Sequence, residues 1–316
     1  MGITEQQRRL LELCAIRIDR ESVDWTLIAR QAQDPSGLDD LYDAIITEKS
    51  AAADKSRPVL REGLRDLSAP AARVTAELEA AAAAGAQLVT VLDRDYPANL
   101  RLIPNLPPFL FYRGELIEDD ARSVAVVGTR HASDAGIRRG ASMSRLLAEQ
   151  GVTVVSGLAK GIDTVAHRAA LEAAGRTVAV LGTGITRCYP SENNDLAEEI
   201  TANGALVSQF WPTNPPSRYT FPRRNVVTSG ISQGTVVIEA TGTSGAKMQA
   251  RLALEHGKKV FLIHSLVTKQ PWARDYVDKR GAIEVESVDE VSAQLAAPER
   301  VRQATDQQQQ LALSYL

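Results

Sequence analysis

One stretch near the middle of the chain constrains the fold most, because short β-branched runs alternate there with glycine-containing turns. Residues 123–127 form such a run, which ends at Gly128, and residues 153–155 form another, which ends at Ser156-Gly157. Residues 136–151 between them carry apolar side chains at helical spacing. Continuous apolar strands are typical of parallel sheets that are buried on both faces, and a right-handed crossover joins such strands. The pattern predicts an α/β fold with a doubly wound, mostly parallel sheet.

The glycine turns after these strands are predicted to meet at one edge of the sheet, where doubly wound folds bind ligands. Glycine lets the backbone approach a phosphate closely, and the N–H groups that begin the next helix point toward an anion. We therefore expect a phosphate site here, although neither turn is a complete G-x-G-x-x-G or P-loop motif. In the simpler alternative, the turns only connect elements. The candidate residues are Gly128, Thr129, Arg130, Ser156, Gly157 and Lys160.

Composition limits the possible partners and compartment. The chain has 316 residues, of which 44% are hydrophobic and 24% charged, and its net charge is −3. A histone-like coat of positive charge is excluded, so any contact with nucleic acid requires a local basic patch. Apolar runs stay short of the ~20 residues of a membrane span, and no signal-peptide core precedes the first helix. Cys14 and Cys188 are too few for a disulfide framework, and no Cys/His cluster has zinc spacing. We expect a cytoplasmic protein without a metal or cofactor.

Three regions are predicted along the chain. Residues 1–84 contain several amphipathic segments and turn signals, which predict a small helical N-terminal domain with a packing or interaction role. Residues 85–298 contain the predicted sheet. Residues 299–316 form a Gln-rich tail, which is expected to be flexible or weakly helical.

Further strands are predicted around the opening unit. Residues 88–92 and an aromatic run at 109–112 precede it and could extend one edge of the sheet. Residues 212–222 are rich in proline and predict a long surface loop, a feature that is often functional. The later strands are expected at residues 177–181, 205–208, 235–239, 259–263 and 283–285.

The end of that proline-rich segment is the most informative short motif outside the opening unit. Phe221 offers a stacking face to a base, while Arg223 and Arg224, followed by Asn225, can meet phosphates. This combination favours binding of a nucleic-acid strand. The alternative is a buried phenylalanine beside two solvated arginines.

Two features allow a catalytic interpretation. Asp163 and His167 lie four residues apart at the start of one predicted helix, a spacing that suits acid–base chemistry but also simple capping of the helix dipole. Glu239 ends a predicted strand at the ligand edge and could contact a sugar hydroxyl or act in hydrolysis. Structural roles are favoured for the Asp163 and His167 pair.

Several motifs, in order, resemble the DNA-processing protein A (DprA/Smf) family over residues 86–263. The motifs are Val124–Arg130 with Ser133 and Gly136, Val154–Asp163 with Ala166 and His167, Val178–Gly184 with Tyr189, Pro190 and Asn193, Phe221–Asn225, Ser229–Ser232, and Glu239-Ala240 with Ser244 and Gly245. The resemblance implies an extended Rossmann-like domain that is not an enzyme. It also implies that the protein binds single-stranded DNA, dimerises and hands the strand to the RecA recombinase in natural transformation.

Carried over to this sequence, the resemblance places a DNA pocket at the two glycine turns and at Phe221, Arg223, Arg224 and Asn225. The chain departs from the family pattern at Val226, which replaces an arginine, and at Lys247, which adds a cation that we include among the candidates. The N-terminal region lacks a clear helix-hairpin-helix signature, and the tail is too short for a winged helix. Two alternatives stay open: a nucleotide-binding or nucleotide-hydrolysing protein of phosphoribohydrolase type that uses Glu239, and a similar core that serves defence against foreign DNA.

Overall fold

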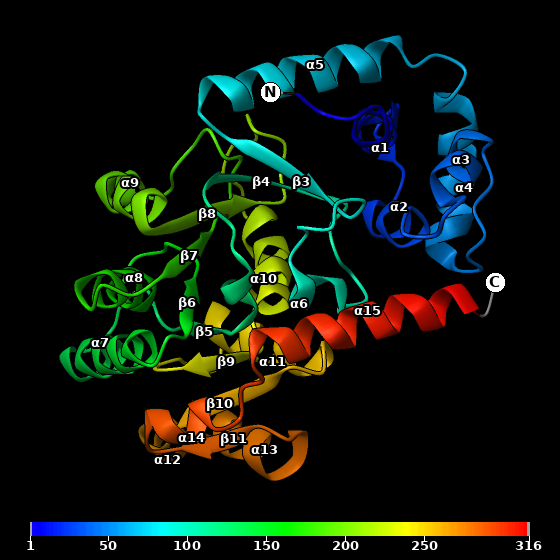
Figure 1. Cartoon of the computed structure of the whole chain (residues 1–316). Coiled ribbons are helices and arrows are strands. Elements are labelled where there is room, and N and C mark those ends of the chain that lie inside the picture. Colours follow the sequence, from blue (N-terminus) through cyan, green and yellow to red (C-terminus); the bar gives the residue numbers. More distant parts are fainter. Residues whose placement is uncertain (1, 315–316) are drawn as a thin grey trace.

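The computed structural model describes residues 2–314, with side chains described up to residue 307. The chain begins with a group of helices and one small hairpin, which pack beside the top of a large sheet (Figure 1). The helices are α1 (Glu5–Ala15), α2 (Trp25–Gln31), α3 (Gly37–Tyr42), α4 (Ala51–Gly63) and α5 (Ser68–Ala83). The hairpin consists of β1 (Arg17–Ile18) and β2 (Glu21–Ser22).

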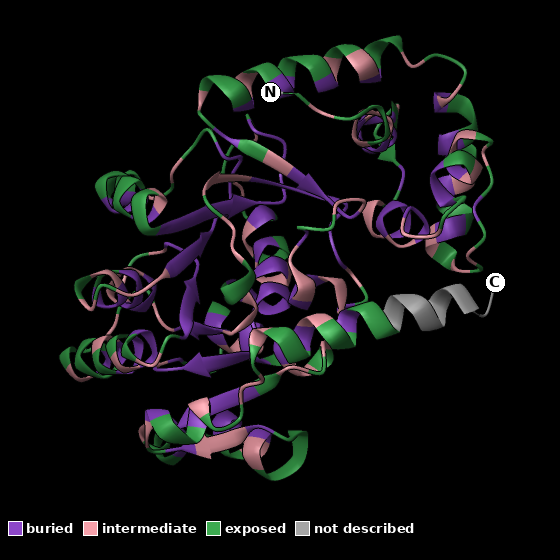
Figure 2. Cartoon of the chain, in the orientation of Figure 1, coloured by how far each residue is buried: buried purple, intermediate pink, exposed green. Residues whose placement is uncertain are grey.

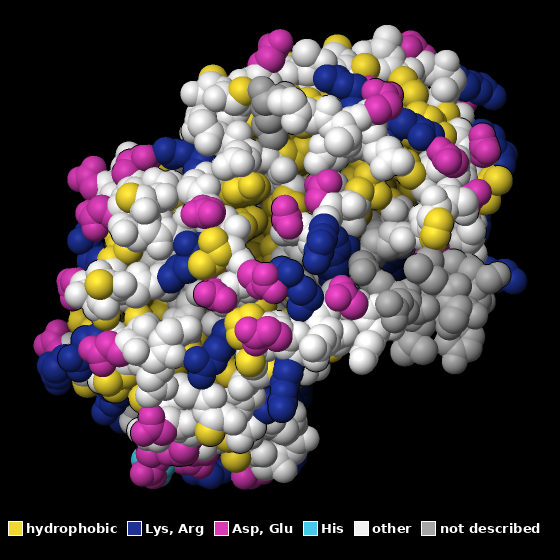
Figure 3. All heavy atoms as spheres, viewed as in Figure 1, with side chains coloured by type: hydrophobic (Ala, Val, Ile, Leu, Met, Phe, Trp, Pro, Cys, Tyr) yellow, Lys and Arg dark blue, Asp and Glu magenta, His cyan; other side chains and the backbone are white. Residues whose placement is uncertain are grey.

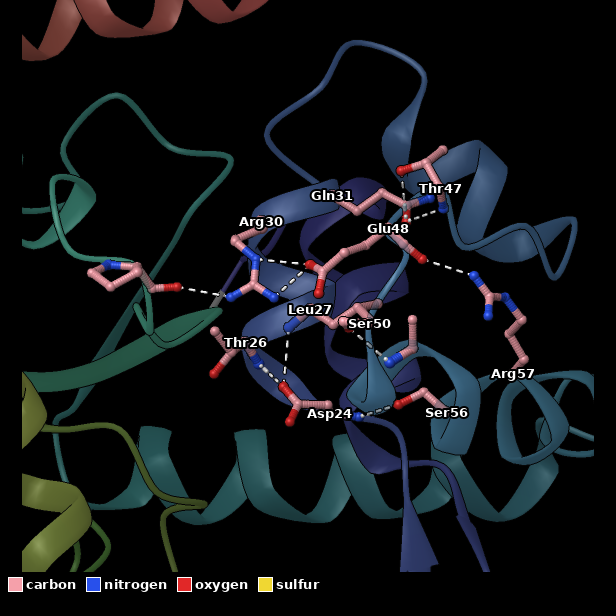
Figure 4. Close-up of polar contacts among 12 residues, drawn as sticks. Asp24, Thr26, Leu27, Arg30, Gln31, Thr47, Glu48, Ser50, Ser56 and Arg57 are labelled. Atoms are coloured by element: carbon pink, nitrogen blue, oxygen red, sulfur yellow. Dashed lines mark hydrogen bonds and ion pairs between the residues drawn. The ribbon is translucent and has the colours of Figure 1, made fainter.

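Side-chain caps fix the starts of α1, α2 and α4. The Asp24 carboxylate accepts hydrogen bonds from the amides of Thr26 and Leu27, which are two of the donors that lack an intrahelical partner at the start of α2. The amide of Asp24 in turn donates to the hydroxyl of Ser56 on α4 (Figure 4). Arg30 on α2 pairs with Glu48 and so holds the loop that precedes α4. These contacts join α2, α4 and their connecting loop into one unit.

The main sheet has nine strands in the order β11-β10-β9-β5-β6-β7-β8-β4-β3. All neighbouring strands are parallel except at β4, which is antiparallel to both β8 and β3. The two early strands thus extend one edge of the sheet. The strands are β3 (Gln87–Thr90), β4 (Phe109–Gly114), β5 (Ser123–Val127), β6 (Thr153–Ser156), β7 (Thr177–Val180), β8 (Gly204–Ser208), β9 (Gly234–Val237), β10 (Lys259–Ile263) and β11 (Ile283–Val285).

Helices cover both faces of this sheet, as Figure 1 shows with α7, α8 and α9 on one side and α6, α10 and α11 on the other. Every residue of β5, β6 and β7 is buried, as expected for strands that are covered twice (Figure 2). The predicted α/β fold with a mostly parallel, doubly wound sheet is confirmed. The helices of this part are α6 (Ala98–Arg101), α7 (Asp134–Glu149), α8 (Ile162–Glu172), α9 (Asn194–Asn203), α10 (Thr220–Ile231), α11 (Gly245–Glu255), α12 (His264–Lys269), α13 (Pro271–Arg280), α14 (Val288–Ser292) and α15 (Pro298–Ser314), with 3-10 turns η1 (Glu118–Ala121) and η2 (Ser191–Asn193).

One segment differs from the sequence prediction, and a second has one of the two structures expected for it. The proline-rich loop ends earlier than predicted, because α10 begins at Thr220 and contains Pro222 in its first turn. Proline is tolerated there since its missing N–H would have no helical partner. The Gln-rich segment, which was expected to be flexible or weakly helical, lies in α15, where Val301 and Thr305 are buried. The side chains of residues 308–316 lie outside the described part of the structure.

An aromatic cluster joins the first helices to the sheet. The ring of Trp25 on α2 lies 5.0 Å from that of Phe109 on β4, which in turn lies 5.0 Å from Trp211. Glu77 on α5 accepts hydrogen bonds from the amide and hydroxyl of Thr213. The position of the N-terminal helices relative to the sheet is therefore set by packing as well as by polar contacts. No helix within residues 2–314 has the length and apolar content needed to cross a bilayer.

Candidate nucleic-acid interface

A pocket of about 500 Å³ lies at the point where the chain direction along the sheet reverses. β5 and β9 are neighbours, and the chain proceeds from β5 toward β8 but from β9 toward β11. The carboxyl ends of strands at such a switch point form the usual ligand crevice of a doubly wound sheet. The lining comes from the turns after β5 and β6, the first turns of α10, and the start of α11. Of the residues predicted for the site, the pocket is lined by Gly128, Thr129, Arg130, Gly157, Phe221, Arg224 and Asn225.

The two glycines are required by packing at the edge of the pocket. A Cβ on Gly128 would lie 2.4 Å from Cγ1 of Ile162, the first residue of α8. A Cβ on Gly157 would lie 1.6 Å from Nη1 of Arg224. Both distances are far shorter than a van der Waals contact, so the backbone of each turn approaches another element closely because no side chain intervenes. We expected the missing side chains of these glycines to make room for a phosphate. The structure shows that they make room for α8 and for the guanidinium group of Arg224.

Arg224 ties the second glycine turn to α10. Its side chain is buried, and Nη1 donates to the carbonyl oxygens of Gly157 at 2.6 Å and Val180 at 3.0 Å. Burial raises the pKa of the Asp163 carboxyl, and the positive charge of Arg224 opposes that rise. Burial likewise lowers the pKa of Arg224, while Asp163 acts in the opposite direction. Arg224 is thus the counter-charge of a buried carboxylate as well as part of the pocket wall.

An accessible aromatic and cationic surface lies at the mouth of the pocket. The ring of Phe221 is half-buried, and Cζ of Arg130 lies 5.4 Å from its centroid. The Tyr189 ring lies 5.7 Å from the same phenyl ring and is 48% exposed. Phe221 rests on Gly182, where a Cβ would come within 2.6 Å of the ring. These groups offer a flat stacking face beside a cation, which suits an unstacked base next to a phosphate.

The remaining predicted residues have other positions. The hydroxyl of Ser156 is buried and donates to the carbonyl oxygen of Val126 at 2.7 Å. Lys160 lies beside the pocket mouth but pairs with Glu192 at 2.5 Å. Lys247 has its Nζ 5.7 Å from the Trp272 ring. Arg223 lies on another side of the first turn of α10, with Cζ 5.9 Å from the Trp25 ring. These four side chains are not brought together at the pocket.

Two residues of this surface were not among the predicted site residues. Arg218 lines the pocket just before α10 begins, and Tyr189 extends the aromatic face. Tyr189 belongs to one of the sequence motifs, and Arg218 stands shortly before another. Both lie far along the chain from the glycine turns, so the sequence did not show that they are close to those turns in space. Within residues 2–307, neither Arg130 nor Arg218 forms an ion pair with a carboxylate.

Comparison with known proteins identifies the family. The family described as DNA recombination-mediator protein A matches residues 87–296, which is most of the chain. The chain belongs to this family. The Smf protein of Escherichia coli is 38% identical over 260 residues, covering 79% of this chain and 69% of that protein. DNA processing protein DprA of Streptococcus pneumoniae is 40% identical over 174 residues, covering 55% of this chain and 61% of that protein. The match to the Smf protein of Synechocystis covers 45% of that protein's length.

Solved structures of the DNA recombination-mediator protein A family share the fold. The crystal structure of DprA from Streptococcus pneumoniae superposes with a TM-score of 0.73 at 29% identity, and the match covers 94% of this chain and 99% of that chain. A structure of DNA processing protein A from Helicobacter pylori, which is described in terms of its single-stranded DNA binding mode, gives a TM-score of 0.58 at 24% identity over 66% of this chain and 94% of that chain. The family consists of DNA-processing proteins rather than enzymes, in agreement with the sequence resemblance.

His167 and Glu239, which were both considered for catalytic roles, have structural positions in this family member. His167 is fully buried, and its Nδ1 lies 2.7 Å from the hydroxyl of Thr177. Burial, together with the charge of Arg224, lowers the pKa of His167 to about 3, so its imidazole is neutral near neutral pH. Glu239 accepts hydrogen bonds from the hydroxyl and amide of Ser133, the residue that caps α7. Its carboxylate therefore holds the start of α7, which argues against the hydrolytic role considered above.

Proposed function

We propose that this chain binds single-stranded DNA in the pocket between the turn after β5, the turn after β6 and the first turn of α10. The observation that carries the proposal is the accessible pair formed by Phe221 and Arg130 beside a pocket of about 500 Å³. A base can stack on the phenyl ring while the arginine and Arg218 meet the backbone phosphates. The single-stranded DNA binding named for the Helicobacter pylori relative supports the same conclusion.

The shape and charge of the site favour a single strand over a duplex. Stacking on Phe221 requires an unpaired base whose face is free, and the bases of a duplex already stack on one another. Positive and negative side chains are interspersed over the face drawn in Figure 3, and the net charge of the chain is −3. Broad attraction to duplex phosphates is therefore weak, and affinity has to come from the local groups at the pocket.

Within this proposal, the residues predicted from sequence take two kinds of role. Arg130 and Phe221 contact the strand directly, with Thr129 and Asn225 at the pocket wall. Gly128, Ser156, Gly157 and Arg224 shape that wall through the contacts described above. Lys160 becomes a phosphate ligand only when its pair with Glu192 opens. Arg223 and Lys247 lie outside the pocket.

The test is fluorescence anisotropy of a labelled oligothymidylate across a salt series, with duplex DNA and free nucleotides as competitors. For the double variant Arg130→Ala and Arg218→Ala, we expect weaker binding and a log–log salt slope smaller by about 1.4, which is ~0.7 per lost phosphate contact on a single strand. Arg168→Ala is the matched control, because Arg168 is an exposed arginine on α8 that does not line the pocket. Unchanged binding by the double variant, or competition by mononucleotides alone, contradicts the proposal.

The wider role follows the resemblance. We propose a cytoplasmic homodimer that passes a bound strand to the RecA recombinase, with residues 1–84 as an accessory helical domain, residues 85–298 as the DNA-binding domain, and residues 299–316 as an appended segment. Light scattering after size exclusion tests the dimer, since a monomeric mass at micromolar concentration rejects it. Transfer of the strand to RecA is tested by strand-exchange assays in which this protein is first bound to the single-stranded substrate.

A further inference from the structure

A second groove, of about 540 Å³, lies between the N-terminal helices and the other side of the first turn of α10. Its walls are formed by the β1–β2 hairpin, the starts of α2 and α4, α5, and residues 210–223. Four cationic side chains from both walls converge on it: Arg17, Lys55 and Arg73 from the N-terminal region, and Arg223 from α10. Of these four residues, only Arg223 was predicted from the sequence to contact DNA.

The cations of this groove are not neutralised by neighbouring carboxylates. In the part of the chain with described side chains, none of the four forms an ion pair. Burial lowers the pKa of the Arg73 guanidinium, and the nearby charge of Arg17 lowers it further, which shows that like charges are held together. Glu77 opposes this shift, but its carboxylate already accepts two hydrogen bonds from Thr213.

The acidic groups at the groove do not cancel this charge. The carboxylate of Asp24 caps α2 through the amides of Thr26 and Leu27, as Figure 4 shows. Glu21 is the other acidic side chain in the lining, and it lies on the exposed hairpin. Four cations therefore face two carboxylates, one of which is engaged by backbone donors.

Aromatic rings lie between these cations. Arg223 lies over the ring of Trp25 at 5.9 Å, and Arg73 lies over the ring of Trp211 at 5.0 Å. Tyr219, at the rim, is 64% exposed. Trp211 is buried and Trp25 is part-buried, so the exposed ring of Tyr219 is the main face on which a base could stack, beside the cations that could meet phosphates.

The groove is continuous with the pocket along the chain. Arg218 lines the pocket, whereas the next residues, Tyr219 and Thr220, line the groove. Within the first turn of α10, Phe221 and Arg224 face the pocket and Arg223 faces the groove. The guanidinium of Arg218 donates to the Tyr219 hydroxyl at 2.5 Å, so a cation and an aromatic ring lie together where the pocket meets the groove.

We propose that the bound DNA strand continues from the pocket past Arg218 and Tyr219 into this groove, where Arg17, Lys55, Arg73 and Arg223 contact its phosphates. This inference rests on the proposed single-strand binding and extends it, because it makes the N-terminal region part of the DNA-binding surface. A short oligonucleotide fills the pocket alone, whereas a longer one also occupies the groove. Affinity and salt dependence are therefore expected to increase with oligonucleotide length until the groove is filled.

The test compares the full-length chain with the double variant Arg17→Gln and Lys55→Gln, which removes two charges and keeps long polar side chains. Binding is measured by fluorescence anisotropy for oligothymidylates of about 6 and about 20 nucleotides, which bracket most of the ~4–16 nucleotides that one single-strand site covers. The matched control is Arg61→Gln with Arg65→Gln. Both control residues are exposed in the N-terminal region and do not line the groove.

For the long oligonucleotide, we expect the groove variant to lose about 1.4 from its log–log salt slope, or ~0.7 per phosphate contact. If the two proteins converge at ~1 M salt, this slope difference is about a 25-fold loss of affinity at ~0.1 M. Binding of the short oligonucleotide and both affinities of the control should stay unchanged. Equal affinity of the groove variant and the wild type for the long oligonucleotide overturns the inference but leaves the pocket proposal intact. Failure of the wild type to bind either oligonucleotide rejects the proposed function itself.

Discussion

Replacing Arg224 tests whether the pocket wall depends on a buried cation. Arg224→Met keeps most of the side-chain volume but removes the donors to the carbonyl oxygens of Gly157 and Val180. It also leaves the Asp163 carboxylate buried without its counter-charge. Leaving a buried acceptor without its donor typically costs about 1–3 kcal/mol, and more where a charge is involved, so for two acceptors and one carboxylate we expect a loss of about 3–5 kcal/mol near neutral pH.

The stability loss caused by Arg224→Met should depend on pH, and the titration of Asp163 determines whether that loss grows or shrinks as the pH rises. Burial raises the pKa of this carboxyl in the folded state, so its contribution to stability is fullest below its ordinary pKa and is lost as the pH rises through the folded value. The charge of Arg224 opposes this rise in pKa. Without Arg224, the folded-state pKa of Asp163 is higher still, so the loss of stability continues to higher pH. The charge of Arg224 also lowers the pKa of the buried His167, so its removal makes protonation of the imidazole less costly in acid. Both effects make Arg224→Met less harmful at acidic than at neutral pH.

The assay is urea unfolding followed by circular dichroism at about pH 5 and about pH 7.5, because the loss caused by Arg224→Met is expected to be smaller at the lower pH. The variant Asp163→Asn serves as the matched background, since Arg224→Met in that background leaves no buried charge. A double-mutant cycle should give a coupling of ~0.5–3 kcal/mol at the higher pH. The reasoning is refuted if Arg224→Met unfolds at the same urea concentration as the wild type at both pH values, or if the coupling is zero.

Two further predictions concern the same wall. Gly157→Ala places a Cβ 1.6 Å from Nη1 of Arg224 and should destabilise the protein about as much as Arg224→Met, roughly 3–5 kcal/mol, whereas Gly242→Ala, which has open space around it, should stay within ~0.5 kcal/mol in the same urea assay. Phe221→Ala should weaken oligothymidylate binding by about 1–3 kcal/mol, or roughly 5- to 150-fold, in anisotropy measurements. Equal affinities for Phe221→Ala and the wild type would rule out stacking on this ring.

The central fold could be predicted because its strands carry a local signal. Val124–Val127 and Thr153–Val155 are runs rich in β-branched residues that stop before a glycine turn, and such apolar runs are typical of strands buried on both faces of a parallel sheet. The start of α10 was missed because Pro222 reads as a loop residue until its position in a first turn is known. The amides of Tyr219 and Thr220 donate to the hydroxyl of Ser217, which forms a turn directly before the helix that the proline-rich context concealed.

The side-chain roles within the site were less predictable than the fold. A sequence identifies Arg224 and Lys160 as cations, but it does not reveal that one faces two carbonyl oxygens and the other a carboxylate. The two partners of Arg224 stand 67 and 44 residues away along the chain, and the partner of Lys160 stands 32 residues away. Arg130, in contrast, follows its strand directly, and its place at the pocket follows from the fold alone. Arg224 lies within α10, so its contacts depend on what that helix packs against.

The pair formed by Arg130 and Phe221 suggests how the free site accepts a base. In the structure, the guanidinium lies 5.4 Å from the ring centroid and covers part of the face that a base would use. A cation–π contact at an exposed site contributes about 0.5–1 kcal/mol, whereas a base stacked on an aromatic side chain contributes ~1–3 kcal/mol. Exchange of the arginine for a base is therefore favourable, and it releases Arg130 to meet the phosphate of the incoming nucleotide. Until DNA arrives, the arginine shields an aromatic ring that would otherwise be open to water.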